Sequence, residues 1–528
     1  MEYNSWLYVL LFLGCTVFLY YVFPLRLRWG VLLGASAAFY LFGSRQLVIV
    51  MLLSTVIIYC GALELDRGEK RYHQQKAALQ KEERRRVREK LAIHNRHVLV
   101  AALTAAIGIL FFFKYFNFLG MNLNLLFENL HLPLHIPALH LLLPLGISFY
   151  TLSAVSYLVD VSRGACEAQR NFGKLLLFLM FFPVITEGPI SRYGQLGTQL
   201  AEGHRFDYRK FCFGIQLILW GFFKSVVMAN RLAAVVGNLF SSYSSHSGSV
   251  VILTVMMYTL QIYMDFSGGI DIARGSAELF GVTLTPNFAR PFFANSVNDF
   301  WRRWHISLGA WLRDYIFYPI SLSHPFQVLS KKSRSRLNSY YAATIPALLA
   351  LLAVWLGNGI WHGAAWKYIV YGLYYYVIMA LGMLLEPLFV RLLHLLHLNR
   401  EGKVYHLWQI LRTFCLVNIG MLIFRADTLP IAWSMILSMF RPNLEASPQQ
   451  IFNAQGLPYH QQEIILVGLV LVLAVSILQE RGVNLREWIA RRALPIRWSI
   501  YITAVLAVVI AGAYGPGFGV VDFIYAQF

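Results

Sequence analysis

The amino-acid sequence predicts an all-α polytopic membrane protein. Of its 528 residues, 58% are hydrophobic and only 13% are charged, whereas soluble domains carry about 25% charged residues. Apolar runs recur along the whole chain, and a helix of about 20 such residues crosses the roughly 30 Å hydrocarbon layer of a membrane. Because no internal repeat or low-complexity linker interrupts this pattern, we expect a single membrane domain over residues 1–528, with about 11 spans plus re-entrant helices.

The positive charge of the chain lies in short segments between the apolar runs. The sequence has 45 Lys and Arg against 26 Asp and Glu, a formal net charge of +19. Cytoplasmic loops of membrane proteins carry an excess of Lys and Arg, so this distribution indicates topology and argues against nucleic-acid binding. Segment 66–97 holds eleven Lys and Arg against five acids. We predict that it is a cytoplasmic helix, solvated or lying on the headgroups, and that the N-terminus is outside.

The expected spans follow one another along the chain. Three of them begin near Trp6, Leu27 and Leu47. The later spans cover approximately residues 98–118, 144–161, 211–228, 250–266, 342–361, 366–383, 407–424, 464–478 and 499–514. A weaker apolar run lies at 431–439, and the tail 517–528 is expected outside.

Two segments do not fit a simple crossing. The apolar run 175–190 is short and has basic residues on both sides, which predicts a re-entrant element. Irregular backbone is tolerated at membrane depth only where protein or a cavity surrounds it, so we expect a cavity. Segment 131–140 has three histidines, but Pro133 and Pro137 prevent a regular helix, so an interfacial loop is expected rather than a metal site. The five cysteines show no metal-binding spacing, and no metal is predicted.

Two Trp-His pairs are the main candidates for a site. His305 ends the segment 298–305, and His362 lies within 358–363. Ionisable groups at membrane depth are expensive and are functional candidates by default. The flanking basic segments place the stretch around His305 on the cytoplasmic side, and they place His362 at the turn between two spans. We therefore expect both histidines at the centre of an acyl-transfer site.

The chemistry of a hydroxyl acceptor explains why histidine is expected there. Acyl transfer to an alcohol needs a base, and a neutral imidazole suits this task near neutral pH. Burial disfavours the imidazolium, so an apolar site would keep His362 neutral. Gly359 and Gly363 would let a substrate chain pass close to the backbone. The nearby tryptophans could line a tunnel for the acyl arm, although tryptophan also collects at membrane interfaces for other reasons.

A charged patch precedes and follows His305 in the sequence. Guanidinium groups match phosphate geometry, so the patch could hold the phosphates of coenzyme A or of a phosphopantetheine carrier. A structural ion-pair cluster is the alternative. The candidate substrate- or donor-binding residues are Asp299, Trp301, Arg302, Arg303, Trp304, Arg313, Asn358 and Trp361. We expect no bound cofactor, only an acyl donor such as acetyl-CoA or an acyl carrier, and the absence of a Walker motif argues against coupling to ATP.

Several of these segments together resemble a known family. The segments similar to the membrane-bound O-acyltransferase superfamily are 287–288, 299–308, 311–315 and 361–366, with 144–150, 181–183, 188–190 and 265–268. Within it they resemble most the bacterial branch that contains alginate O-acetylases and teichoic acid D-alanyl transferases. The resemblance covers roughly 144–386, and the tail 523–528 also resembles the acetylases. After Ile320, however, 321–326 departs from the alginate pattern, so the resemblance does not identify alginate as the polymer.

The resemblance implies a fold and a mechanism. It implies a ring of tilted transmembrane helices around a thinned centre, with His362 as the principal catalytic histidine and His305 as the second essential one. It also implies an acyl donor that arrives from the cytoplasm and a polymer hydroxyl that arrives from outside.

The expected function is acyl transfer, most simply of acetyl, from a cytoplasmic thioester to hydroxyls of an exported cell-envelope polysaccharide. The expected location is the bacterial plasma (inner) membrane, and the expected partners are the polysaccharide acceptor, the thioester donor and the lipid bilayer. A periplasmic or extracellular helper protein is left open. The alternatives are D-alanyl transfer from a carrier protein to teichoic acid, and a polysaccharide or lipid transporter without acyltransferase activity.

Overall fold

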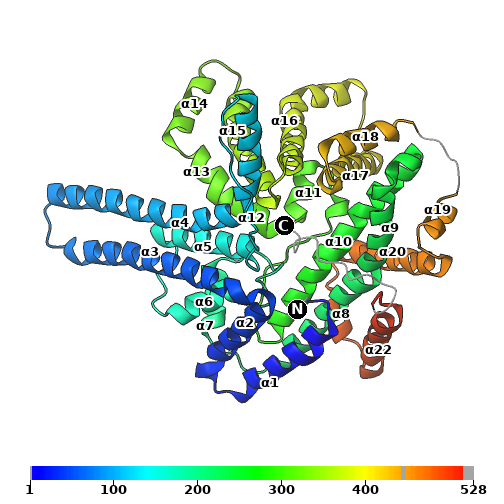
Figure 1. Cartoon of the computed structure of the whole chain (residues 1–528), viewed down its shortest axis with the longest axis horizontal. Coiled ribbons are helices and arrows are strands. Elements are labelled where there is room, and N and C mark those ends of the chain that lie inside the picture. The colour runs from blue at the N-terminus through cyan, green and yellow to red at the C-terminus, as the bar shows by residue number, and fades with distance from the viewer. Residues whose placement is uncertain (1–2, 442–446, 515–528) are drawn as a thin grey trace. The chain divides into compact units, whose positions relative to one another are not determined.

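The computed structural model describes residues 3–441 and 447–514, and their regular structure is helical (Figure 1). Between these described residues, the only β-type pairing is an isolated antiparallel bridge of Phe288 with Trp304. The all-α prediction is therefore confirmed. The predicted tail segments 517–528 and 523–528 lie outside the described residues.

The chain forms two compact units. The first consists of Met1–Gly214 with Ala273–Thr285, and the second of Ile215–Ile272 with Pro286–Phe528. The single domain over 1–528 and the ring of helices around a cavity stay predictions.

The first unit contains the long helical pair α3 and α4, which lie side by side (Figure 1). Its helices are α1 (Gly14–Val22), α2 (Arg28–Ser44), α3 (Val48–Gln75), α4 (Lys81–Asn129), α5 (Ile147–Ser162), α6 (Phe172–Met180) and α7 (Thr198–Ala201). The basic segment 66–97 is divided between the end of α3, a turn and the start of α4. Gln80 and Glu83 form a capping box that starts α4, and the acids of its first turn complement the helix dipole.

Two segments that the sequence predicts to be irregular lie in the first unit, where the loop is confirmed and the re-entrant path stays a prediction. Helix α6 has nine residues, and at 1.5 Å per residue it is about 14 Å long, less than half of a membrane crossing. This length fits a re-entrant element. Segment 131–140 is a loop, as predicted. The Asn124 side chain holds it by accepting from Ile136 N–H (2.8 Å) and donating to Ile136 C=O (2.9 Å).

The second unit carries both Trp-His pairs. Its helices up to the first pair are α8 (Tyr208–Phe222, which begins in the first unit), α9 (Asn230–Ser241), α10 (Gly248–Glu278, which ends in the first unit) and α11 (Val297–Arg303). Next come α12 (Ile306–Leu312), α13 (Tyr318–Ser321), α14 (His324–Arg334), α15 (Ser339–His362), α16 (Trp366–Leu395) and α17 (Lys403–Arg425). The last are α18 (Leu429–Met439), α19 (Pro448–Ala454), α20 (Tyr459–Glu480), α21 (Leu485–Ala490) and α22 (Leu494–Ala511).

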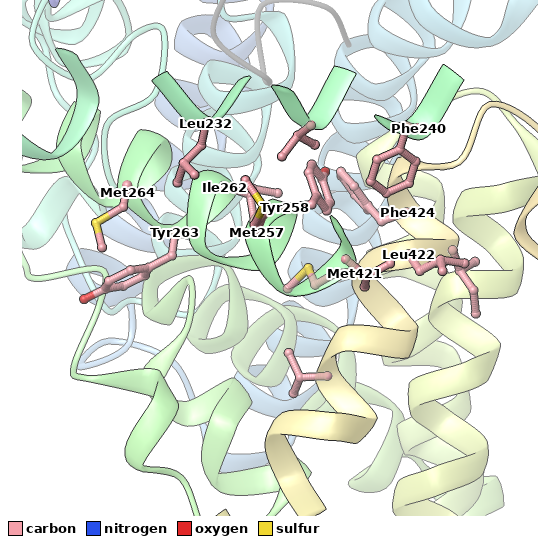
Figure 2. Packing of buried hydrophobic residues seen from close by; sticks show 14 of the residues in the cluster. Leu232, Phe240, Met257, Tyr258, Ile262, Tyr263, Met264, Met421, Leu422 and Phe424 are labelled. Atoms are coloured by element: carbon pink, nitrogen blue, oxygen red, sulfur yellow. The ribbon is translucent and has the colours of Figure 1, made fainter. Parts of the chain in front are cut away.

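The core of the second unit is a continuous apolar cluster. Figure 2 shows side chains from α9, α10 and α17 in this cluster, among them Leu232, Tyr258, Met421 and Phe424. Lipid tails are as apolar as these side chains, so in a membrane such a core is stabilised by close packing rather than by removal from water. Phe424 matters for the site because it also contacts His362.

Nine candidate membrane spans occur among the described residues. They are Leu25–Gln75, Lys81–Asn129, Tyr208–Ser241, Gly248–Glu278, Ser339–His362, Trp366–Leu395, Lys403–Arg425, Tyr459–Glu480 and Leu494–Ala511. The first of these contains both α2 and α3, which the sequence predicts as separate spans. The multi-pass prediction is confirmed, and His362 ends one span just before the next begins, as predicted. The side of the membrane on which each loop lies stays a prediction.

Candidate active site

His305 lies in a loop that is fixed by backbone hydrogen bonds on both sides. Ala289 N–H donates to Arg303 C=O (2.9 Å), and Ile306 N–H donates to Asn287 C=O (3.0 Å). These two bonds lie on either side of the bridge between Phe288 and Trp304. The segment before α11 is thereby paired with the residues that join α11 to α12.

The backbone of His305 adopts the left-handed conformation, with φ +47° and ψ +52°. For a residue with a side chain this costs of order 1–3 kcal/mol and persists only where the surroundings enforce it. The strained residue ends the turn after α11 and begins α12, and only 2% of its surface is exposed. The loop therefore holds the imidazole in one buried position.

The Asn287 amide lies against the ring of His305. Asn287 Oδ1 accepts a hydrogen bond from Ser307 N–H at 2.9 Å. Its Nδ2 lies 3.2 Å from His305 Nδ1, and Oδ1 lies 3.4 Å from the same nitrogen. Burial lowers the pKa of His305 to about 3, because the imidazolium would lose its hydration. The ring is therefore neutral at physiological pH.

His362 is held by packing in an aromatic cage. It is the last residue of α15 and is 4% exposed. Its ring centroid lies 5.0 Å from Trp361, 5.6 Å from Tyr371 and 5.2 Å from Phe424. Tyr371 comes from α16 and Phe424 from α17, so three helices fix the position of this ring.

Trp361 brings the two histidines together. Its ring contacts His305 at a centroid distance of 5.6 Å and His362 at 5.0 Å. Phe266 of α10 also contacts the ring of His305, and the centroids of these two rings lie 4.9 Å apart. Residues 57 positions apart in the chain thus share one buried aromatic neighbour. This is the arrangement that a site centred on both histidines requires.

The glycines beside His362 serve helix packing, which corrects the expectation that they leave room for a substrate chain. A Cβ on Gly359 would lie 2.4 Å from Tyr368 C=O, and one on Gly363 would lie 2.4 Å from the Tyr368 ring. On the facing helix, a Cβ on Gly372 would lie 2.3 Å from Trp355 C=O. The absence of side chains lets α15 and α16 approach closely, as small residues do in membrane helix pairs.

The candidate residues Trp304 and Trp301 pack in different places. Trp304 is buried between Phe288 and Phe300, with centroid distances of 5.0 and 5.4 Å, and it supports the loop of His305. Trp301 packs instead on Trp355 at 5.1 Å.

Three polar atoms at and near the contact of Trp301 with Trp355 are buried without a hydrogen-bond partner in the described part of the chain. They are the indole N–H groups of Trp301 and Trp355 and the side-chain oxygen of Asn358. Asn358 itself is 3% exposed, one helical turn before His362 on α15. A bound substrate could satisfy such atoms, because buried polar groups are otherwise costly.

The charged patch is partly an ion-pair network. Arg303 contacts Asp299 at 3.1 Å and Glu480 at 3.0 Å, and Glu480 also pairs with Arg290. Asp299 and Arg303 are therefore engaged with protein, which favours the structural alternative for these two residues.

Two other cations of the patch lie at the surface. Arg302 is exposed, and the Arg313 side chain is 58% exposed beside Asp314, at 3.0 Å. Of the predicted cations, Arg302 and Arg313 are therefore the more accessible to a ligand, and Arg313 is already paired with Asp314.

Several contacts of the site cannot be derived from the sequence motifs. Tyr371, Phe424 and Glu480 lie outside every Trp-His segment, and Asn287 was noted only as part of a resemblance. Glu480 carries a detectable signal, since it is an acid at the end of an apolar run where basic residues follow. Tyr371 and Phe424 carry none, because aromatic residues are common in apolar spans.

Comparison with known proteins agrees with the geometry. Residues 168–424, which contain both histidines, match the family described as MBOAT, membrane-bound O-acyltransferase family. The chain is 30% identical over 441 residues to a probable alginate O-acetylase of Azotobacter vinelandii, which covers 83% of this chain and 78% of that protein. The chain therefore belongs to the membrane-bound O-acyltransferase family, and it is an acyltransferase.

Two further relatives differ in their acceptor or acyl group. A peptidoglycan O-acetyltransferase of Helicobacter pylori is 29% identical over 372 residues, covering 66% of this chain and 65% of that protein. A teichoic acid D-alanyltransferase of Bacillus subtilis is 29% identical over 284 residues, covering 53% and 67%. The family resemblance and the enzyme interpretation are confirmed over the transporter alternative.

Proposed function

We propose that this enzyme transfers an acetyl group from a cytoplasmic thioester donor to hydroxyl groups of an exported cell-envelope polysaccharide. The observation that carries the proposal is the pair of buried histidines joined by Trp361 within the family region. The relative from Azotobacter vinelandii, matched over 78% of its length, is named as an acetylase of a polysaccharide, which supports this acyl group and acceptor class.

In the proposed reaction, the His362 imidazole accepts the proton of the acceptor hydroxyl. The hydroxyl oxygen attacks the thioester carbonyl, the new C–O bond forms, and the C–S bond breaks. The proton then passes from His362 to the leaving sulfur, so that a thiol and an ester are the products. A positioned base of this kind contributes about 10²–10⁴-fold to the rate.

The donor would be acetyl-CoA or an acyl carrier, and its phosphates would meet Arg302 and Arg313. Both side chains are exposed, and guanidinium groups bind phosphate through charge-assisted hydrogen bonds. The proposal places the protein in the bacterial plasma membrane, with the polysaccharide arriving on the outer side. Delivery of the polysaccharide by a helper protein is compatible with it.

Replacement of His362 with Ala tests the proposal. Membranes that contain the variant should incorporate no acetyl group into the polysaccharide, while membrane insertion and expression stay at the wild-type level. Full transfer by the variant would remove His362 from the reaction. A Trp408→Phe variant is a suitable control, because Trp408 is an exposed residue of α17.

D-alanyl transfer to teichoic acid is the second candidate, because the Bacillus subtilis relative matches over 67% of its length. Mild base releases ester-linked groups from the cell envelope, and mass spectrometry then separates acetate from alanine. Loss of acetate in a deletion strain supports the first proposal, and loss of alanine supports the second.

A further inference from the structure

We propose that Asn287 holds the neutral ring of His305 in the tautomer with its proton on Nε2, so that His305 serves the reaction as a hydrogen-bond donor and not as a second base. The proposal rests on the proposed acyl transfer and assigns different tasks to the two histidines. Asn287 is a positioning residue in this scheme, since it acts through His305.

The orientation of the Asn287 amide is fixed by the backbone. Ser307 N–H points at Asn287 and donates to Oδ1 at 2.9 Å. If the amide were turned over, two donors would face each other across this distance. The oxygen therefore lies toward Ser307, and Nδ2 lies on the remaining side of the amide.

The position of Nδ2 determines the state of the facing ring nitrogen. Nδ2 is the nearer of the two amide atoms to His305 Nδ1, at 3.2 Å against 3.4 Å for Oδ1. A proton on Nδ1 would face the Nδ2 donor across 3.2 Å, whereas a bare Nδ1 accepts from it. Because a neutral imidazole carries one proton, that proton is on Nε2.

The surroundings of His305 keep its ring from rotating by a half-turn. A half-turn of the ring would exchange Nδ1 for a carbon and leave the Asn287 N–H without its acceptor. Both residues are buried, at 1% for Asn287 and 2% for His305, so the lost hydrogen bond would not be replaced by water. Phe266 and Trp361 also contact the ring at 4.9 and 5.6 Å.

An Nε2–H donor is useful in acyl transfer at the carbonyl oxygen. When the hydroxyl oxygen adds to the thioester carbonyl, negative charge develops on the carbonyl oxygen. A fixed donor in a buried site stabilises this charge, and loss of one such donor typically costs about 10²–10³-fold in rate. His362 then takes the hydroxyl proton and returns it to the leaving sulfur, while the proton of His305 stays on Nε2 throughout.

Replacement of Asn287 with Asp gives the sharpest test. The carboxylate still accepts from Ser307 N–H, but its second oxygen draws the proton to His305 Nδ1 and leaves Nε2 bare. As the pH falls, uptake of a proton by the carboxyl group or the imidazole restores the proton on Nε2. At pH 8 the variant should therefore transfer the acyl group about 10²-fold more slowly than the wild type. The ratio of the variant rate to the wild-type rate should rise at least tenfold by pH 5.5.

A ratio that does not change with pH would overturn the proposal. Asn238→Asp is the matched control, because Asn238 is an exposed residue of α9 whose side chain donates to Gln455 C=O at 3.1 Å. Its ratio should stay near one at every pH. The proposed function is tested separately, by acetyl transfer in the wild type and by its loss in His362→Ala.

A second pair of variants keeps the test independent of the folding of Asn287→Asp. Glutamine can place an amide N–H near the position of Nε2 but cannot act as a base. We therefore expect His305→Gln to be at least tenfold more active than His305→Ala. Equal loss in the two variants would contradict a donor role.

A spectroscopic measurement tests the tautomer without any activity. In protein labelled with ¹⁵N-histidine, the difference between wild type and His305→Gln isolates the two ring nitrogens of His305. The expected result is a protonated Nε2 and an unprotonated Nδ1 at pH 7. The reverse pattern would overturn the proposal even in a fully active enzyme.

Discussion

The surroundings of His305 and His362 differ in kind, although the two rings share Trp361. His305 is held by hydrogen bonds, through a paired loop, a left-handed backbone and the Asn287 amide. His362 is held by aromatic packing at a helix end. A hydrogen bond selects one tautomer of an imidazole, whereas an aromatic cage fixes the position of the ring. Two histidines of one site can therefore be held in ways that suit different protonation tasks.

The strongest contrast is expected between glutamine at position 362, where a base is lost, and glutamine at position 305, where a hydrogen-bond donor is kept. His362→Gln should be as inactive as His362→Ala, about 10²–10⁴-fold below wild type, because an amide cannot accept the hydroxyl proton. His305→Gln should keep part of the activity. Acetyl transfer measured in membranes of matched protein content checks the contrast. Partial activity at position 362 would remove the distinction between the two rings.

The next effect tests the packing that positions His362. In Gly372→Ala the new Cβ would meet Trp355 C=O at 2.3 Å, so α15 and α16 must separate. We expect a loss of about 1–3 kcal/mol of stability, seen as a lower melting temperature in detergent, together with reduced transfer.

Gly382→Ala provides the control in the same helix, because no atom of the described residues lies within 4 Å of its added Cβ. It should be neutral or stabilising by up to about 1 kcal/mol. Equal melting temperatures of the two variants would show that the close approach at Gly372 is not needed.

The pH dependence of stability tests the burial of His305. Its pKa is lowered from 6.5 to about 3 by burial. The unfolded chain therefore takes up a proton below pH 6.5 that the folded protein does not. Proton uptake by the unfolded chain lowers the free energy of unfolding. The folded protein has its full stability above pH 6.5 and loses stability as the pH falls toward 3, by an amount of order 2 kcal/mol at pH 5.

The expected result is a wild-type melting temperature that falls more between pH 7 and pH 5 than that of His305→Gln, which has no such proton to exclude. Parallel melting curves would contradict a neutral buried His305. His94→Gln is a control, since the His94 side chain is 54% exposed.

The smallest effect concerns the ion pairs behind the His305 loop. Glu480→Gln weakens the contacts to Arg290 and Arg303, whose side chains are 30% and 24% exposed. Partly exposed pairs contribute at most about 1 kcal/mol each, so we expect a severalfold loss of transfer and a small change in melting temperature. Glu463→Gln, an exposed acid of the same helix, should change neither. A loss of activity as large as that of Asn287→Asp would give Glu480 a more direct role.

Much of the fold could be predicted because its signals are local. Continuous apolar runs identify α15 and α16, and Pro133 and Pro137 identify a loop, since each signal depends on neighbouring residues. The interpretation of Gly359 and Gly363 was wrong for the opposite reason. A glycine leaves space only if no partner fills it, and the partner, Tyr368, is supplied by the next helix.

The residue pattern alone was enough to predict a helical membrane acyltransferase with two Trp-His pairs, because composition, apolar length and ordered motifs are properties of the chain. Three contacts became known from the folded chain: Asn287 faces Nδ1 of His305, Glu480 pairs with Arg303, and Trp361 contacts both imidazoles. Such contacts depend on distances between segments far apart in the chain. A tautomer or an ion pair depends on a few tenths of an ångström, which no residue pattern encodes.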